Sequence, residues 1–450
     1  EVIRRHEVLR TSFPRVGDLP VQAIAPAESI SVPVVNLSEL PEGARESEAL
    51  RLAVEEARLP FDLARGPLLR IRILRLDEEQ HYVLFTMHHI ISDGWSMGVL
   101  VRELASLYGA FSTGKPSPLP ELPVQYADFA YWQRRWLQEG AEETQLTYWQ
   151  QQLAGSRPVL RLRTDRPHPA IQTFQSATQS LSIAQALSDE VRHLSRREGV
   201  TQFMTLLAAF EILLRRYTQE DDMLIGTDVA NRNCREIEGL IGFFVNQLVL
   251  RTDLSGDPSF KDLLGRVRAT ALGAYRHQDL PFEKLVEVLK PNRSANYSPL
   301  FQVKFIYQTA HEEALEIPGG VLTPLDFHQP TTNLNLLMSI EDNGHELDIS
   351  LQYATDLFDA ATINRMLGEF DALLGLIITK PEVRLSALDA ALDEFGQQQQ
   401  AAREDQYKEA RRSLFRNIKQ KAGHGNGRSK EPEQATPEVE NIKHQATIVS

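Results

Sequence analysis

The sequence predicts a mixed α/β (α+β) fold of two units followed by a disordered polar tail. Strand-like and helix-like hydrophobic patterns alternate along both halves of the chain, and a proline-rich extended segment separates the halves near residue 170. Beyond residue 393 the composition becomes polar and highly charged. We therefore expect an N-terminal unit over residues 1–170, a C-terminal unit over 171–393 and a tail over 394–450.

The composition narrows the class of protein. A chain of 450 residues with 42% hydrophobic and 24% charged residues can bury a sizeable core, which excludes collagen-like, coiled-coil and wholly disordered chains. Its one cysteine, Cys234, excludes an intrachain disulfide and a thiolate zinc cluster. The net charge of −13 argues against nucleic-acid binding, and no stretch of about 18 apolar residues predicts a membrane span. These features are typical of a soluble, cytoplasmic protein.

The N-terminal unit opens inside a helical pattern formed by Val2, Ile3, Val8 and Leu9. Since the first residue is glutamate rather than methionine, we expect upstream sequence to complete this unit. Period-two alternation and helical spacing then predict strands over 68–76 and 81–90, a helix over 97–111 and helical sequence over 129–155. Residues 157–173 hold too many prolines for a helix and are predicted to be an extended crossover.

The C-terminal unit is predicted to contain the same mixture of elements. Apolar periodicity predicts helices over 201–218, 260–277 and 361–378, and strands over 221–230, 242–254, 300–308 and 346–355.

The tail over 394–450 is nearly free of aromatic residues, so it buries too little apolar surface to offset its ordering entropy. A helix over 404–422 is one local expectation, because Leu414, Phe415 and Ile418 form a short apolar patch among basic residues. Two interpretations stay open for this tail: a solvated linker, and a helix that binds a carrier or another partner.

The segment MHHIISDGWS (87–96) carries the strongest chemical signal. At the end of a strand, side chains alternate, so we expect one of His88 and His89 to point inward and the other outward. Histidine can accept a proton near neutral pH, Asp93 can pair with an arginine, and Gly94 permits a turn with positive φ. A buried core histidine and a metal ligand are alternatives, but the sequence offers no companion ligands, so we expect no metal.

These residues resemble a known family. HHIISDGWS is similar to the HHxxxDG signature of the condensation domains of nonribosomal peptide synthetases, which belong to the chloramphenicol acetyltransferase-like superfamily. Other segments resemble further motifs of that family in the expected order: RHEVLRTSF (5–13), YADFAYWQ (126–133), TDRPHP (164–169), GTDVANRN (226–233), IGFFVNQLVLR (241–251), HQDLPFEKLVE (277–287), RSANYSPLFQVKF (293–305) and YATDLFDAATI (353–363).

Several positions depart from the family pattern. The first core motif, expected upstream of residue 1, is absent, which supports a truncated first lobe. Gln247 stands where threonine is usual, Ser294 where aspartate is common, and Asn335 where a stretch often reads Phe-Asp-Leu. The donor or acceptor preference of the domain is the property that these departures put in question.

The resemblance implies two acetyltransferase-like lobes that meet in a V around a central substrate tunnel. It implies that the α-amine of an acceptor aminoacyl thioester attacks a donor acyl or peptidyl thioester and forms an amide. Phosphopantetheine on upstream and downstream peptidyl carrier domains would hold the substrates, the domain would bind no cofactor of its own, and it would belong to a larger multimodular synthetase.

The resemblance also assigns roles to residues. His89 is the predicted catalytic histidine, and His88 is predicted to pack on the opposite face of the strand. Asp93 is predicted to pair with Arg5 or Arg10 and to hold the loop, and the Gly94 N–H is a candidate donor to an oxyanion. Ser96, Asn246, Gln247 and Asn335 are candidate tunnel or substrate residues, whereas Tyr126, Phe129, Trp132 and Trp149 are predicted to be core.

Two other functions stay open beside condensation. An epimerisation domain shares HHxxxDG but usually continues as Asp-Gly-Val-Ser-Trp, whereas this chain reads Asp93-Gly94-Trp95-Ser96. A non-catalytic module that recruits a carrier or another enzyme tends to lose the active histidine, whereas His89 is present. A cyclisation domain would replace the paired histidines with aspartates, so it is excluded. Within condensation domains, the motifs look more like the type that joins two L-configured residues.

Overall fold

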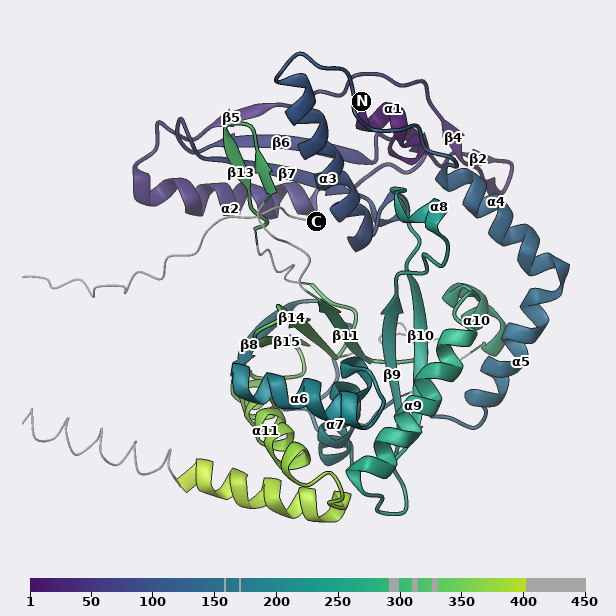
Figure 1. The fold of residues 1–450 in the computed structure, drawn as a ribbon, viewed down its shortest axis with the longest axis vertical. Coiled ribbons are helices and arrows are strands. Elements are labelled where there is room, and N and C mark those ends of the chain that lie inside the picture. The colour runs from purple at the N-terminus through teal and green to yellow at the C-terminus, as the bar shows by residue number, and fades with distance from the viewer. Residues whose placement is uncertain (158, 170, 291–298, 310–314, 326–330, 402–450) are drawn as a thin grey trace, which may run out of the picture.

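The computed structural model describes residues 1–401 except 158, 170, 291–298, 310–314 and 326–330. It contains two mixed α/β units, with the N-terminal unit above the C-terminal unit in Figure 1. Each unit has its own sheet and its own helices, so the predicted mixed α/β class is confirmed.

A three-stranded sheet forms the base of the N-terminal unit, in the order β5 (Val34–Asn36), β6 (Leu69–Arg75) and β7 (His81–Met87). β5 pairs with β6 in parallel, and β6 pairs with β7 antiparallel. Two helices bury the apolar side chains of this sheet in separate clusters: α2 (Glu42–Arg58) and α3 (Gly94–Phe111). The shorter elements of the unit are α1 (Val2–Arg5), η1 (Glu7–Arg10), β1 (Thr11–Ser12), β2 (Arg15–Val16), β3 (Leu19–Pro20), β4 (Ala23–Ile24) and η2 (His89–Ile91).

A six-stranded sheet forms the C-terminal unit, and helices α6, α7 and α11 lie together against it (Figure 1). The strand order is β10 (Asn246–Asp253), β9 (Asp222–Val229), β11 (Val303–Thr309), β14 (Leu336–Asp342), β15 (Leu347–Ala354) and β8 (Ser176–Ile183). The helices in this half of the chain are α6 (Gln185–Arg197), α7 (Gln202–Thr218), α8 (Arg235–Glu238), α9 (Phe260–Arg276), α10 (Phe282–Leu289) and α11 (Ala360–Thr379). The hairpin of β12 (Leu315–Ile317) and β13 (Gly320–Leu322) lies against α3 of the N-terminal unit (Figure 1).

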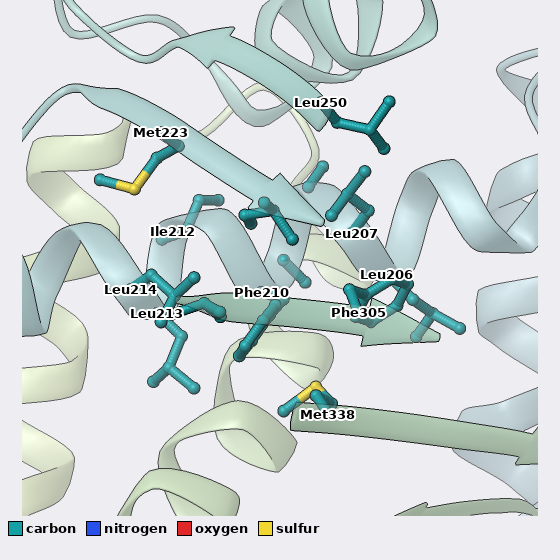
Figure 2. Packing of buried hydrophobic residues seen from close by; sticks show 14 of the residues in the cluster. Leu206, Leu207, Phe210, Ile212, Leu213, Leu214, Met223, Leu250, Phe305 and Met338 are labelled. Carbon is teal, nitrogen blue, oxygen red and sulfur yellow. The ribbon is translucent and has the colours of Figure 1, made fainter. Parts of the chain in front are cut away.

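The main hydrophobic core lies between this sheet and its helices. α7 is apolar on nearly all sides because neighbouring helices surround it, and the Thr201 hydroxyl caps its first turn by accepting a hydrogen bond from the Met204 N–H. Phe210 of α7 packs against Phe305 of β11 with ring centroids 5.7 Å apart, and Met338 of β14 lies next to them (Figure 2). This face of the sheet is therefore dry and filled by side chains.

Three consecutive helical elements run along one side of the molecule and connect the units: α4 (Tyr126–Trp136), a π turn η3 (Leu137–Ala141) and α5 (Glu142–Gln152) (Figure 1). Trp149 of α5 is buried in the core of the C-terminal unit, and its indole N–H donates to the His277 carbonyl at 2.9 Å. Trp132 of α4 is 54% exposed, so the prediction that it is a core residue is wrong. The boundary near residue 170 stays a prediction.

Most predicted elements occur, and the differences have physical causes. The strand predicted to reach residue 90 ends at Met87, because the chain turns there into the 3₁₀ turn η2. β8, β14, α2, α6 and α10 were not predicted, and among them β8 and α2 are rich in polar residues. Residues 394–401, predicted to be disordered, continue a helix that begins at 385, because Leu388 and Leu392 anchor it in the core. The remainder of the predicted tail, including 404–422, lies outside the described residues.

Candidate active site

His89 lies on the 3₁₀ turn η2 that follows β7, and not within a strand as predicted. His88 caps this turn, because its Nδ1 accepts a hydrogen bond from the Ile90 N–H at 3.1 Å. The His88 ring packs edge-on against Phe61 with centroids 5.9 Å apart, and burial together with the neighbouring His89 lowers the pKa of His88. His88 contacts Phe61 and His89 contacts Phe243, so the two rings have different neighbours. The expected cause, alternation along a strand, is wrong because the two residues lie at a 3₁₀ turn.

The local contacts of His89 select one tautomer. Its Nδ1 lies 2.7 Å from the Ser92 carbonyl oxygen, which can only accept, so Nδ1 carries the proton. Nε2 then keeps its lone pair when the ring is neutral. The ring edge contacts Phe243 with centroids 5.0 Å apart, and the residue as a whole is exposed. His89 is thus oriented by these contacts and is an exposed residue.

Asp93 is the centre of a buried hydrogen-bond network that joins the two units. As N-cap of α3 it accepts hydrogen bonds from the Ser96 N–H at 2.8 Å and from the Ser96 hydroxyl at 2.7 Å. From the C-terminal unit it accepts the N–H groups of Phe244 and Val245 at 2.9 and 3.3 Å. The Arg232 guanidinium donates to the same carboxylate at 3.1 Å. Only 5% of Asp93 is exposed, so its lone pairs serve the fold rather than a substrate.

Arg232, which the sequence analysis missed, is the true partner of Asp93. Its other contacts are hydrogen bonds to the carbonyls of Ile237 and Leu240, each at 2.7 Å, and to the Ser96 hydroxyl at 2.8 Å. Burial lowers the pKa of Arg232, and the Asp93 charge opposes that shift. The predicted pairing of Asp93 with Arg5 or Arg10 is therefore wrong, because the partner comes from a segment 139 residues away in the sequence. The sequence signal for Arg232 was its place in GTDVANRN (226–233), one of the segments that resemble a family motif.

Arg5 supports the site from a second buried cluster. It pairs with Glu103 of α3 at 2.9 Å, and His6 contacts the same carboxylate at 3.0 Å. Burial raises the pKa of Glu103, but hydrogen bonds from His6 and Arg5 outweigh burial and leave it lowered. His6 also accepts a hydrogen bond from the Ile241 N–H at 3.2 Å. This cluster therefore holds the segment 241–245, whose Phe244 and Val245 N–H groups donate to Asp93.

Arg10 lies outside both clusters. It donates to the Ala25 carbonyl at 2.5 Å and pairs with Glu7 at 3.3 Å, so it stabilises the turn at β4 and has no contact with the loop of His89. Its predicted support of Asp93 is wrong.

Three of the four candidate substrate residues are buried or hydrogen-bonded inside the fold. Ser96 and Asn335 are 0% and 2% exposed, so the prediction that they line a tunnel is wrong. The Asn246 amide is used inside the fold, where it donates to the Gln278 and Leu280 carbonyls at 2.7 Å each. Gln247 is half-buried on β10 and stays a candidate. Ser294 lies outside the described residues.

Gly94 is the first residue of α3, and its φ is not positive. The predicted left-handed turn is therefore absent at this position. A Cβ built at Gly94 would meet no atom within 4 Å, so the glycine leaves open space beside its backbone. Its N–H belongs to the first turn of a helix, where N–H groups have no partner within the helix.

Tyr126 closes the site on the side of α4. Its hydroxyl donates to the Phe243 carbonyl at 2.8 Å, and burial followed by the Asp93 charge raises the pKa of Tyr126 to about 12. The hydroxyl thus stays protonated and fixes the residue that contacts His89.

Among the described residues, no three His, Cys, Asp or Glu side chains gather in a way that could hold a metal ion. No helix in the described part of the chain is both long and apolar enough to cross a membrane.

The sequence of this chain matches a known protein family. A family model described as "Condensation domain" matches residues 1–400. The chain belongs to the condensation domain family. A linear gramicidin synthase from Brevibacillus parabrevis is 47% identical over 389 residues, which are 86% of this chain and 8% of that protein. Phosphinothricin tripeptide synthetase PhsC of Streptomyces viridochromogenes is 42% identical over 86% of this chain and 36% of that protein. The condensation domain thus spans a small part of these relatives.

Solved structures share the fold of this condensation domain. The X-domain from teicoplanin biosynthesis has a TM-score of 0.77 and 30% identity, over 86% of this chain and 87% of that one. The condensation domain of the Monacolin K polyketide synthase MokA has a TM-score of 0.73 at 23% identity, over 85% of this chain and 88% of that one. The predicted family, and with it the class of amide-forming acyltransferases, is confirmed.

Proposed function

We propose that this condensation domain joins a donor acyl or peptidyl thioester to the α-amine of an acceptor aminoacyl thioester, with His89 as the group that moves the proton. The observation that supports this role is the hydrogen bond from the His89 Nδ1–H to the Ser92 carbonyl, which leaves Nε2 of this exposed residue with its lone pair when the ring is neutral. A base needs this free lone pair within reach of an amine.

The reaction balances without an added cofactor. The acceptor amine nitrogen attacks the donor carbonyl carbon, a C–N bond forms and the carbonyl π electrons move to oxygen. His89 Nε2 takes one proton from the attacking nitrogen. The oxyanion then re-forms the C=O bond as the C–S bond breaks, and the leaving thiolate receives that proton from His89. Proton transfer of this kind contributes about 10²- to 10⁴-fold to a rate, which is about 3 to 5 kcal/mol of barrier, and alignment of the two thioesters supplies much of the remainder.

The other site residues act on geometry and charge. Asp93 and Arg232 hold the loop that presents His89, and His88 holds the turn from the other side. The Gly94 N–H is our candidate donor to the developing oxyanion, since it lies at the exposed start of α3 with open space beside it. Gln247 remains the candidate among the predicted substrate residues.

The partners follow from the family. Condensation domains use substrates carried on phosphopantetheine, and the relatives named above are much longer than this chain. We therefore propose upstream and downstream peptidyl carrier domains as partners, within a multimodular synthetase in the cytoplasm. A central tunnel between the two units, no bound cofactor of the domain's own, and no nucleic-acid or membrane partner are parts of the same proposal.

A single-turnover assay tests this function. Donor and acceptor carrier proteins loaded with aminoacyl groups are mixed with the protein, and products are followed by intact-protein mass spectrometry. His89→Ala should slow amide formation by about 10²- to 10⁴-fold. His81→Ala is the matched control, because His81 is an exposed histidine at the opposite end of β7 and should leave the rate unchanged.

The competing functions give different results. Inversion at Cα of a single carrier-bound substrate, without an amide, would support an epimerisation domain. Preserved carrier binding with no product from any pair would support a recruiting module and overturn our proposal.

A further inference from the structure

The two faces of the sheet in the C-terminal unit differ in chemistry. Phe305 of β11 packs onto Phe210 and Phe203 of α7, with ring centroids 5.7 and 5.5 Å away. Because side chains alternate along a strand, Lys304 projects to the opposite face. The pairing register places half-buried side chains along that face on the neighbouring strands: Ser339, Ser350, Gln352 and Thr178 are polar, and Leu337, which pairs with Lys304, is apolar. Alternation of this kind is typical of a sheet with one dry face and one wet face.

An ion pair lies on this polar face. The Lys304 ammonium is 2.6 Å from the Asp228 carboxylate of β9, and the two side chains are 11% and 25% exposed. Gln247 of β10 is directly opposite Asp228 in the antiparallel register, so its side chain shares the same face. Three adjacent strands thus bring a carboxylate, an ammonium and a carboxamide together.

These groups have hydrogen-bonding capacity that the described contacts leave unused. A carboxylate offers about four acceptor positions and an ammonium three donors, and the pair uses one of each. One Asp228 oxygen is buried with no hydrogen-bond partner among the described residues. An ion pair of this kind is weak evidence of added stability.

The cluster is close to the catalytic loop along the chain. The Val245 N–H donates to Asp93, and Phe243 contacts the His89 ring. Gln247 follows two residues later on β10, which is about 7 Å of strand. The cluster therefore begins about 7 Å of strand away from the segment that contacts the loop of His89.

We infer that Asp228, Lys304 and Gln247 form a specificity subsite that favours a thioester substrate with a hydroxyl or carboxamide side chain over an aliphatic one. A hydroxyl or carboxamide both donates to Asp228 and accepts from Lys304, whereas an aliphatic group leaves both partly buried groups unsatisfied. This inference rests on the proposed condensation reaction and deepens it by naming the class of substrate.

A competition assay tests the subsite. Threonyl and valyl thioesters, which have the same shape, are offered in equal amounts first as acceptor and then as donor, so that the two arms identify which substrate is read. Asparaginyl and leucyl thioesters form a second pair of probes. The product ratio reports relative kcat/KM, and it does not depend on how much of a variant is folded.

The wild-type protein should favour the polar member at least about tenfold in one arm. Asp228→Ala combined with Lys304→Met, which removes both charges, should bring that ratio near one. Asp222→Asn is the matched control: it weakens the 2.8 Å pair between Asp222 of β9 and Arg251 of β10 and should keep the wild-type ratio. Equal products from the wild type in both arms, or an unchanged ratio in the double variant, would overturn this inference alone. Absence of amide from every pair would overturn the proposed function and this inference with it.

Discussion

Arg232→Met removes the guanidinium that ties the two units together at the catalytic loop. The side chains of Arg232 and Asp93 are 1% and 3% exposed, so solvent screens their attraction little. The variant loses the ion pair, the bond to the Ser96 hydroxyl and the bonds to the carbonyls of Ile237 and Leu240. Methionine keeps most of the side-chain volume, so the change is mainly electrostatic.

Removing one partner of a buried ion pair costs about 3 to 5 kcal/mol. Asp93 keeps four hydrogen bonds, from the Ser96 N–H and hydroxyl and from the N–H groups of Phe244 and Val245, so the lower end of that range applies. We therefore expect the free energy of unfolding to fall by about 3 kcal/mol. Ser92, whose carbonyl orients His89, directly precedes Asp93, so loss of Arg232 should also displace the His89 ring. A displacement of about 1 Å lowers a rate by about 10²-fold, and we expect amide formation to slow by this factor.

Urea denaturation followed by tryptophan fluorescence measures the loss of stability, and the single-turnover assay measures the rate. Arg51→Met is the control, since Arg51 is 58% exposed and pairs only with Glu48 and Glu55 on the surface of α2. It should leave the free energy of unfolding nearly unchanged. If Arg232→Met costs no more than this control, the reasoning about the buried tie is refuted. Coupling of at least about 0.5 kcal/mol in the double variant with Asp93→Asn would confirm that the two residues act as a pair.

Two further predictions concern the core of the C-terminal unit. Burial, offset in part by the nearby Thr252 hydroxyl, raises the pKa of Glu211 to about 8, so the folded state holds a proton that the unfolded state releases above about pH 4.5. The contribution of this group to stability should therefore be largest below pH 4.5 and fall by roughly 3 kcal/mol between pH 4.5 and 7. Glu211→Gln should remove this contribution in denaturation curves recorded across that pH range. Equal slopes of stability against pH in both proteins would contradict the prediction. Trp149→Ala should lower the free energy of unfolding by about 3 to 5 kcal/mol, because Trp149 is 1% exposed and hydrogen-bonded. Trp132→Ala, at a site 54% exposed, should change it by less than about 1 kcal/mol. Similar losses for the two variants would contradict this prediction.

Local chemistry explains which parts of the molecule were predictable. β6, α3, α7, β9, α9 and α11 carry strong apolar periodicity, and each lies within or close to its predicted range. β8 and α6 were missed because Ser176–Ile183 is mostly polar and because one side of α6 faces solvent. Trp132 was misplaced because helical spacing of aromatic residues does not say which face of a helix has a neighbour.

The contiguous motif residues were sufficient to predict the family, the mixed α/β class and the importance of His89 and Asp93, because their chemistry is local. Three features depend on the folded arrangement: Arg232 is the partner of Asp93, a 3₁₀ turn and the Ser92 carbonyl orient His89, and Ser96 is buried. Hydrogen bonds and ion pairs act over about 3 to 4 Å in space, and residues 139 positions apart in the chain reach that distance only after the two units have packed together.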